Sequence, residues 1–360
     1  MKILHIFNSL EYSGAEQMFL DSFLDLKKKG FTNEILITTS YKGKAHEKFL
    51  KKKILINQIK FSDIFIFKYL INILNLIKLF FILQNNRYDR VIINTERNFF
   101  SYSFISMYLL NIKTHRIIHS NFIYNNLLKI KRKIFVYFAN KISVNFISVS
   151  DCVQKNELKN YNNKSKVLLN FIEIKKNKIK FKNDNIYKIF TVGNCSFVKQ
   201  HELLINVLAL LPLNIKWKYL HFGNEEKFKP EQVLAKKLNI LKKCKFYGPT
   251  SNWYKYINQN SIFINCSSRE GLGNATLEAI SLGCIPIISN VPGNITIKKY
   301  IKDVVTYDNT IIDLKSKILN LIKLSKIQKF IITNKINSDL KKKFNKQIYI
   351  KEYQKLVCGK

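Results

Sequence analysis

Two carboxylates flank a glycine-containing turn in the segment 266–289, CSSREGLGNATLEAISLGCIPIIS. An apolar run ends at Cys266, and a helix is predicted to begin at Asn274, a residue type that suits the N-cap. Glu270 precedes this helix, and Glu278 follows eight residues later, on its second turn. Glycines and a helix N-terminus favour a bound anion. The pattern indicates a site where Glu278 accepts ribose hydroxyls and Glu270 holds sugar hydroxyls, and its alternative is an ordinary strand–turn–helix with a surface acid.

A second strand–turn–helix pattern carries a lysine. In TVGNCSFVKQHELLI, 191–205, Gly193 frees a turn after an apolar run, and Lys199 supplies positive charge ahead of the next helix. Such a turn suits the two phosphates of a diphosphate. The alternative is a solvated lysine, because lysine is frequent throughout the chain.

Two further candidates lie in the first third of the chain. Gly14 opens a predicted helix within FNSLEYSGAEQMFLDSF, 7–23, and lets the helix N-terminus approach a phosphate or an acceptor. His119 ends a strand-like run, where parallel sheets place ligand-binding groups. An incidental helix cap and a structural, hydrogen-bonding histidine are the alternatives. We expect structural roles for the other histidines, which are His5, His46, His115, His201 and His221.

Short apolar runs alternate with helical patterns, which is typical of doubly wound α/β domains. A lysine-rich stretch, 174–187, divides the 360 residues into two such series and predicts two domains in tandem, with the chemistry in the cleft where they face each other. The predicted strands are 2–7, 34–39, 90–95, 115–119 and 145–150, then 188–193, 216–223, 243–248, 261–266 and 284–289. The predicted helices are 14–29, 64–84, 98–111, 127–141, 200–211, 230–241, 274–282 and 344–357.

The segment 64–83 is apolar enough to be compared with a membrane span. Its polar residues Lys68, Asn72, Asn75 and Lys78 fall on one helical face, and a spanning helix would not place two lysines near its middle. We expect an amphipathic helix packed on the sheet, with a membrane-interface position as the alternative. Residues 1–7 are too short for a signal peptide and are predicted to form the first strand.

The net charge of +37, from 61 basic and 24 acidic residues, indicates an anionic partner or a sequence rich in Lys, Asn and Ile through low-GC coding. The basic cluster Lys129, Lys131, Arg132 and Lys133 lies beside apolar residues in 127–141, a combination that suits an anionic membrane face as well as a solvated helix rim. The six cysteines show no metal-ligand spacing and are expected to be free thiols.

The segment 266–289 resembles the E-x7-E signature of glycosyltransferase family 4, through EGLG (270–273), LEA (277–279) and GCIPII (283–288). The next residues, VPGN, are similar to those of the capsule and polysaccharide branch of that family. SGAE (13–16) resembles its G-G-A-E motif, and His119 matches a histidine beside the donor sugar. Smaller matches at 88–92, 147–151 and 167–172 extend the resemblance over nearly the whole chain.

The resemblance implies a GT-B fold, with two Rossmann-like domains facing across a cleft. Residues 1–170 with 345–360 would form the acceptor-side domain, and residues 171–344 the donor-binding domain. It also implies a retaining, metal-independent hexosyl-type transferase with a nucleotide-diphosphate sugar as donor and a glycan or lipid-linked acceptor, acting in capsule, lipopolysaccharide or other surface polysaccharide biosynthesis. No metal and no other cofactor is expected.

The family pattern assigns roles to single positions. The catalytic candidates are His119, Lys199 and Glu270. The donor-binding candidates are Gly14, Gly193, Asn194, Lys199, Gly271, Leu272, Gly273, Asn274 and Glu278. Asn194 stands where the family has an arginine, and an asparagine lacks the charged fork that binds phosphate. We therefore expect Lys199 with backbone amides, or Arg269, to neutralise the diphosphate.

Three other functions fit parts of the pattern. A nucleotide-sugar epimerase would share the fold and need no acceptor. A non-catalytic partner subunit is compatible with Asn194. A basic nucleic-acid-binding protein would explain the charge, but no nucleic-acid-binding module is present, so nucleic acid is not an expected partner. The expected location is cytoplasmic, with peripheral attachment to the inner face of the membrane as an extension.

Overall fold

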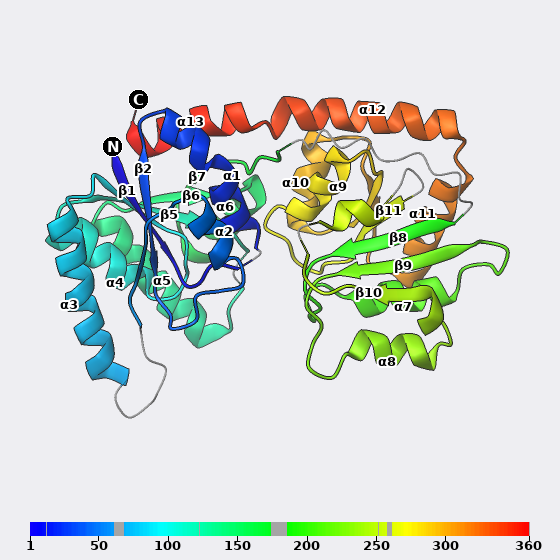
Figure 1. Cartoon of the computed structure of the whole chain (residues 1–360), viewed down its shortest axis with the longest axis horizontal. Helices are drawn as coiled ribbons and strands as arrows, with labels where there is room; N and C mark the ends of the chain where they lie inside the picture. The colour runs from blue at the N-terminus through cyan, green and yellow to red at the C-terminus, as the bar shows by residue number, and fades with distance from the viewer. Residues whose placement is uncertain are drawn as a thin grey trace. The chain divides into compact units, whose positions relative to one another are not determined.

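The computed structural model describes the chain apart from Tyr12, 61–67, Phe122, 174–185, Ser251, 258–260 and Lys360. The chain forms two compact units, Met1–Asn170 with Lys346–Lys360 and Phe171–Asn345 (Figure 1). The predicted start of a helix at 64–67 and most of the lysine-rich stretch lie outside the described residues.

A parallel sheet forms the centre of the first unit, with strand order β3-β2-β1-β4-β5-β6-β7. The strand order reverses between β1 and β4, which pair with Ile3 opposite Arg90. Strand β1 has the sequence KILHIF, and all of it after Lys2 is buried, as is usual for a central parallel strand. The strands are β1 (Lys2–Phe7), β2 (Thr32–Ile37), β3 (Ile56–Gln58), β4 (Arg90–Ile93), β5 (Lys113–Ile118), β6 (Asn145–Ser148) and β7 (Lys166–Val167).

Helices follow the strands of the first unit in turn. Ser13 and Ser150 cap α1 and α6, because each side chain accepts a hydrogen bond from the first turn. The C-terminal helix α13 returns to this unit and contacts α1. The helices are α1 (Gly14–Lys28), α2 (His46–Lys51), α3 (Lys68–Asn86), α4 (Phe99–Ser103), the π-helix η1 (Phe104–Leu109), α5 (Asn126–Lys141), α6 (Asp151–Tyr161) and α13 (Lys346–Cys358).

The second unit repeats this topology in a sheet of order β10-β9-β8-β11-β12-β13. All its neighbouring strands pair in parallel, and the order reverses between β8 and β11. The strands are β8 (Tyr187–Val192), β9 (Trp217–Phe222), β10 (Cys244–Phe246), β11 (Ser261–Asn265), β12 (Pro286–Ser289) and β13 (Val305–Tyr307).

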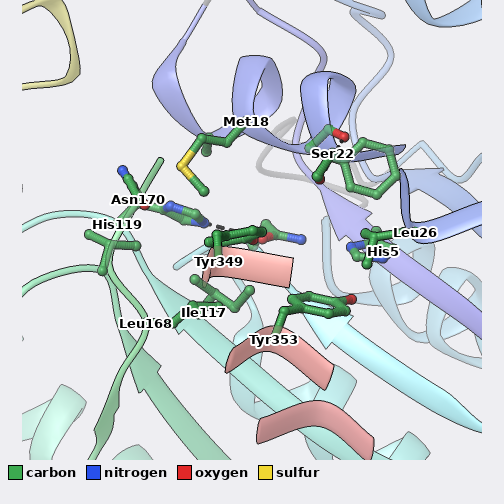
Figure 2. A pocket seen from close by; sticks show the side chains of 14 residues that line it. His5, Met18, Ser22, Leu26, Ile117, His119, Leu168, Asn170, Tyr349 and Tyr353 are labelled. Atoms are coloured by element: carbon green, nitrogen blue, oxygen red, sulfur yellow. Dashed lines mark hydrogen bonds between the residues drawn. The ribbon is translucent and has the colours of Figure 1, made fainter. Parts of the chain in front are cut away.

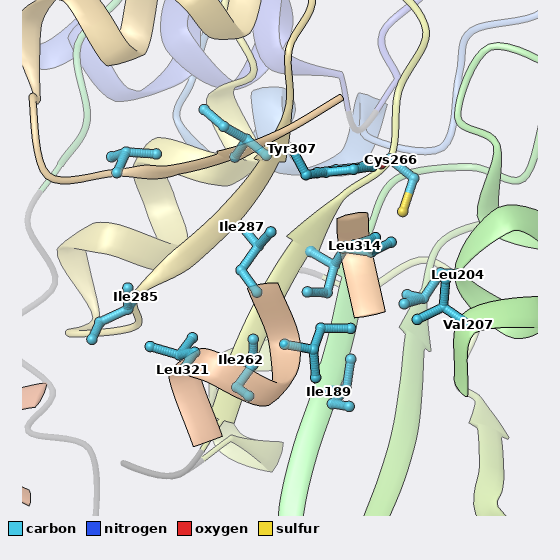
Figure 3. Close-up of a cluster of buried hydrophobic side chains, with 14 of the residues drawn as sticks. Ile189, Leu204, Val207, Ile262, Cys266, Ile285, Ile287, Tyr307, Leu314 and Leu321 are labelled. Carbon is cyan, nitrogen blue, oxygen red and sulfur yellow. The ribbon is translucent and has the colours of Figure 1, made fainter. Parts of the chain in front are cut away.

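Two helical layers cover that sheet. Helix α7 contacts α8 and α11 in one layer, and α12 contacts α9 and α10 in the other. Figure 3 shows the core from the strand residues Ile189, Ile262 and Ile287 to Leu314 and Leu321 of α11. The helices are α7 (His201–Ala209), α8 (Pro230–Lys237), α9 (Asn274–Ser281), α10 (Pro292–Tyr300), α11 (Ile311–Lys323) and α12 (Lys326–Lys343), with short 3-10 turns at Leu241–Lys243 and Trp253–Tyr256.

The structure confirms the prediction of two parallel-sheet α/β domains, and the predicted bounds differ from the observed ones by up to four residues. The helix predicted over 98–111 is instead a short α-helix that continues as a π-helix, in which Leu110 N–H donates to the carbonyl of Ile105 at 3.1 Å. Strands β3, β7 and β13, each of at most three residues, were not predicted.

Helix α3 packs on the first unit only along a narrow stripe. Leu79 and Leu83 are buried, whereas Ile73, Ile77 and Phe81 are about half exposed. The prediction of a helix packed on the sheet therefore holds for one stripe, and a second apolar stripe faces solvent. Among the described residues, no helix combines the length and the apolar character needed to cross a bilayer.

A buried ion network joins four elements of the first unit. Glu96, just after β4, accepts from Arg116 of β5 at 2.8 Å and from Arg132 of α5 at 2.6 Å. Arg132 also pairs with Glu157 of α6 at 3.0 Å. The prediction that Arg132 belongs to an exposed basic cluster is therefore wrong: only 4% of this residue is exposed, because it packs inward to bind two carboxylates.

The charge balance of this network favours the ionised form of Glu96. Burial alone would raise the pKa of Glu96, but the charges of Arg116 and Arg132 and their hydrogen bonds outweigh burial, so the pKa is lowered. The stabilisation is present above the ordinary glutamate pKa of about 4.3 and is lost as the pH falls through the lowered value.

Removing Glu96 should destabilise the first unit strongly. We expect Glu96→Ala to lower the free energy of unfolding in urea by about 3 kcal/mol, because two buried guanidinium groups lose a shared carboxylate. The matched control is Asp25→Asn, which removes the half-exposed ion pair between Asp25 and Lys346, at 2.9 Å. This control should change the free energy by less than about 1 kcal/mol. Equal effects of the two variants would contradict the assignment.

Candidate functional site

The loops after β8 and β11 lie beside each other at the switch point of the second sheet, because these two strands are paired neighbours. The first loop begins at Gly193, whose φ of +144° is rarely adopted by other residues. A β-carbon at Gly223, which follows β9, would overlap the carbonyl oxygen of Gly193. Two glycines therefore allow two neighbouring turns to touch.

Lys199 and Glu270 meet at this switch point. The Nζ atom of Lys199 lies 2.6 Å from Oε1 of Glu270 and forms an ion pair with it. Ser267 donates from its hydroxyl to the same oxygen at 2.7 Å, and Asn265 donates from Nδ2 at 3.4 Å. Two of the three predicted catalytic residues are thus in direct contact, although they are 71 positions apart in the sequence.

A network of buried hydrogen bonds fixes the loop that carries Glu270. Asn265, at the end of β11, donates to Thr276 of α9 at 3.2 Å and accepts from the N–H of Ser267 at 3.0 Å. Asn294 of α10 donates to the Ser289 hydroxyl at 2.9 Å, and that hydroxyl donates to the carbonyl of Ser267 at 2.6 Å. Asn294 is fully buried.

The packing of α10 against the Glu270 loop explains the glycine in the motif VPGN, 291–294. A β-carbon at Gly293 would overlap the backbone of Glu270, so the first turn of α10 can approach the loop only with glycine there. Asn265, Ser267 and Thr276 were not predicted as site residues. Their one sequence signal is the position of Asn265 and Ser267, at the end of a buried strand and just after it.

The turn from Gly271 to Asn274 differs from the prediction in one respect. Gly273 is the N-cap of α9, with φ +57° and no side-chain cap hydrogen bond, so Asn274 is the first helical residue and not the cap. The left-handed φ favours glycine, which explains why the cap is Gly273. Leu272 is buried, 3% exposed, and anchors the turn.

Glu278 lies on the half-buried face of α9. Asn274 and Glu278 are one helical turn apart and are both half-buried, whereas Thr276, Leu277 and Ala279 pack into the core. The second predicted carboxylate therefore lies on the same helix face as the first helical residue, Asn274.

Asn194 accepts hydrogen bonds where a phosphate-binding arginine would donate them. Its Oδ1 accepts from the backbone N–H of Asn224 at 2.9 Å and from Nδ2 of Asn224 at 3.2 Å. Asn194 therefore braces the loop after β8 against the loop after β9. Arg269, the alternative cation, is exposed and precedes Glu270 directly.

Gly14 and His119 belong to the first unit. Gly14 is the first residue of α1, and the N-cap Ser13 accepts from the N–H of Ala15 at 3.3 Å. His119 follows β5 directly, and its Nε2 lies 3.2 Å from Oδ1 of Asn94, which follows β4. Asn94 thus orients the imidazole from the neighbouring strand end.

A pocket in the first unit connects the first turn of α1 with His119 (Figure 2). Met18 and Ser22 of α1, Ile117 of β5, and Tyr349 and Tyr353 of α13 line it. Most of its wall is apolar, and His119 and Asn94 supply polar atoms. Burial, with a smaller contribution from the charge of Arg116, lowers the pKa of His119 to about 3, so its imidazole is neutral at neutral pH.

His119 should make the stability of the first unit depend on pH. The pKa of His119 is about 3 in the folded chain and about 6.5 in the unfolded chain. Between these two pH values the unfolded chain binds a proton at His119 that the folded chain does not bind. The free energy of unfolding therefore falls as the pH drops from about 6.5 towards 3. We expect His119→Asn to reduce this slope by up to about 1.4 kcal/mol per pH unit, measured by urea unfolding at several pH values. The control Leu127→Ala, which changes a side chain that is 83% exposed and does not titrate, should leave the slope unchanged. If His119→Asn keeps the slope of the unsubstituted chain, the neutral state of the His119 imidazole is contradicted.

Comparisons with known proteins assign the second unit to a family. Residues 172–338, which are nearly the whole second unit, match the family of glycosyl transferases group 1. The second unit is a group 1 glycosyltransferase domain. The Lys199–Glu270 contact, the Gly273 cap and Glu278 all lie within the matched residues of this glycosyltransferase.

Relatives extend the likeness to the first unit. The capsular polysaccharide biosynthesis glycosyltransferase CapH of Staphylococcus aureus is 26% identical over 320 residues, which cover 84% of this chain and 85% of CapH. The crystal structure of Anabaena HepE in complex with UDP superposes with a TM-score of 0.82 at 15% identity, covering 99% of both chains. A variant of S. aureus TarM, in complex with fondaparinux, α-GlcNAc-glycerol and UDP, gives a TM-score of 0.77 at 14% identity, covering 99% of both chains. The glycosyltransferase therefore has the GT-B fold.

Proposed function

We propose that this glycosyltransferase moves a hexosyl-type sugar from a nucleotide-diphosphate sugar to a growing glycan or a lipid-linked acceptor in surface polysaccharide biosynthesis. The observation that carries the proposal is the contact between Lys199 and Glu270 at the switch point of β8 and β11. The relative CapH is a capsular polysaccharide biosynthesis glycosyltransferase, and two of the structural neighbours, HepE and the TarM variant, were solved in complex with UDP.

Each group in the second unit suits one part of such a donor. Lys199 supplies positive charge for the leaving diphosphate, and the N-terminal turn of α9 from Gly271 to Asn274 supplies backbone N–H groups. Glu278, on the same helix face as Asn274, accepts the ribose hydroxyls. Glu270 accepts hydroxyls of the sugar, since its carboxylate is already oriented by Ser267 and Asn265.

The proposed transfer proceeds without a catalytic metal ion, because cationic and helix N-terminal groups stabilise the leaving diphosphate. It retains the anomeric configuration through attack on the same face, guided by the leaving phosphate. His119 orients the sugar and acts as a neutral hydrogen-bonding group rather than a base, in keeping with its pKa of about 3 from burial. The Gly14 turn contributes the N-terminus of α1 to the acceptor side.

Substitutions at the ion pair should separate binding from transfer. We expect Lys199→Ala to lower kcat by about a hundredfold, because charge developing on the leaving diphosphate loses its cation. Glu270→Gln should weaken donor binding by about tenfold through weaker hydrogen bonds to sugar hydroxyls. Release of nucleoside diphosphate measures the first effect, and donor-dependent thermal shift across a panel of nucleotide sugars measures the second.

The control for both variants is Lys335→Ala, which removes a lysine that is 65% exposed on α12. It should retain the activity of the unsubstituted chain. Full turnover by Lys199→Ala would contradict its role. Conversion of the donor sugar without any acceptor would indicate an epimerase. Donor binding without transfer to any acceptor would indicate a non-catalytic partner subunit, the alternative with which Asn194 is compatible.

We also propose that the first unit meets an anionic membrane surface through α3, η1 and α5. These helices expose large apolar side chains together with the lysines Lys131 and Lys133. Helix α3 contacts η1, and α4 continues directly into η1. The ring centroids of Phe100 in α4 and Phe138 in α5 are 6.2 Å apart. The three elements α3, η1 and α5 therefore form one face. The exposed apolar residues are Ile73, Leu74, Ile77, Phe81, Tyr108, Leu109, Leu127, Leu128, Ile130, Ile134, Tyr137 and Phe138. Apolar groups beside lysines are typical of interfacial helices.

Vesicle sedimentation should detect this attachment. We expect binding to vesicles that contain phosphatidylserine, weakening as salt rises, and no binding to neutral phosphatidylcholine vesicles. The pair Lys131→Gln and Lys133→Gln should weaken binding at least tenfold, at about 1 kcal/mol per lysine. The matched pair Lys236→Gln and Lys237→Gln, on the exposed face of α8, should have no effect. If the protein does not bind these vesicles at low salt, the proposed attachment to an anionic membrane is refuted.

A further inference from the structure

A cysteine and two histidines converge in the second unit, on residues that the proposed transfer does not use. Cys195 lies in the loop after β8, His201 is the first residue of α7, and His221 lies in β9. One ligand atom from each residue lies within 4.8 Å of the other two, and all three residues are buried. Three separate elements thus bring thiol and imidazole groups together.

The contacts around the histidines orient them as ligands. Nε2 of His221 lies 3.4 Å from the Sγ atom of Cys195, while its Nδ1 lies 3.1 Å from the Thr191 hydroxyl. A hydroxyl on one ring nitrogen fixes the imidazole and leaves the other nitrogen for a metal. The His201 ring lies 4.8 Å from the His221 ring, edge to face. Within the described part of the chain, Nδ1 of His201 is buried and has no hydrogen-bond partner.

A buried carboxylate lies on the helix next to α7. Glu231 is the second residue of α8, which contacts α7, and it is only 3% exposed. Its Oε2 atom is buried and has no hydrogen-bond partner among the residues that the structure describes. Buried polar atoms are almost always paired, so the unpaired Nδ1 of His201, in a cluster with a thiol, calls for a further partner.

We propose that Cys195, His201 and His221 bind a zinc ion, with a water molecule in the fourth position. One sulfur and two imidazole nitrogens form a ligand set that binds Zn²⁺ in preference to harder cations such as Mg²⁺ or Ca²⁺. In tetrahedral zinc sites the ligand atoms are about 3.5 Å apart, so the side chains need to close by about 1 Å around the ion. On binding, the thiol releases its proton to solvent and the sulfur bonds the metal, with no change in oxidation state.

The zinc ion would tie together both ends of the loop that carries Lys199. Cys195 and His201 flank residues 196–200, and His221 anchors them to β9. The ion is structural and takes no part in bond breaking. The zinc site stands on its own residues, whereas its effect on Lys199 rests on the proposed function.

Metal titration of the whole chain tests the site. The chain, stripped with a chelator, is titrated with ZnCl₂ and with Co²⁺. We expect one ion per chain, a higher unfolding midpoint with zinc, and a thiolate-to-cobalt charge-transfer band. Cys195→Ser and His201→Gln should abolish the band and weaken zinc binding by about a hundredfold or more. Cys244→Ser, in the same unit but outside the cluster, should behave as the unsubstituted chain does.

Uptake of zinc and cobalt by the unsubstituted chain tests the proposal even if a variant fails to fold. No uptake of zinc or cobalt at one equivalent, or uptake that persists fully in folded Cys195→Ser, overturns the proposal and leaves a metal-free hydrogen-bonded cluster. Donor binding is measured separately by thermal shift, so loss of transfer activity with intact zinc uptake counts against the proposed function and not against the zinc site.

Discussion

The site of the second unit depends on one topological constraint, the reversal of strand order between β8 and β11. In a parallel sheet, the connections from two central neighbouring strands leave in opposite directions, and this opens a crevice at their carboxyl ends. Lys199 and Glu270 follow these two strands, so the sheet itself brings their charges to 2.6 Å. The glycines at 193, 223, 273 and 293 serve the same constraint, because they let turns and helix ends crowd around the crevice.

The polar network beneath Glu270 converts this topology into a fixed geometry. Asn265, Ser267 and Asn294 come from β11, its following loop and α10, so three elements must be in register before the carboxylate is oriented. The ion network of Glu96, Arg116 and Arg132 has a similar part in the first unit, where Arg116 lies three residues before His119. In both units, buried polar contacts rather than apolar packing set the positions of the candidate groups.

The fold and half of the site could be predicted, because strand periodicity and the turn EGLG are local signals. Lys199 and Glu270 were both assigned from their own turns, while their contact arises only from strand pairing. The N-cap was misplaced by one residue, since asparagine is the more frequent N-cap residue and Gly273 caps α9 through its left-handed backbone and not through a side chain. Arg132 was misjudged because its two carboxylate partners lie 36 and 25 residues away. The Cys195, His201 and His221 cluster has no compact spacing because three elements supply it.

The return of α13 to the first unit has a consequence for the order in which the protein folds. Tyr349 and Tyr353 form part of the pocket wall, and Arg90 donates to the carbonyl of Val357 across 267 residues of chain. On the ribosome, the first unit is started early but lacks this wall until all of Phe171–Asn345 has been translated. The second unit, being one continuous segment, can finish folding while its neighbour still exposes an apolar seam. Nascent chains are therefore most vulnerable to aggregation at the unit that is made first.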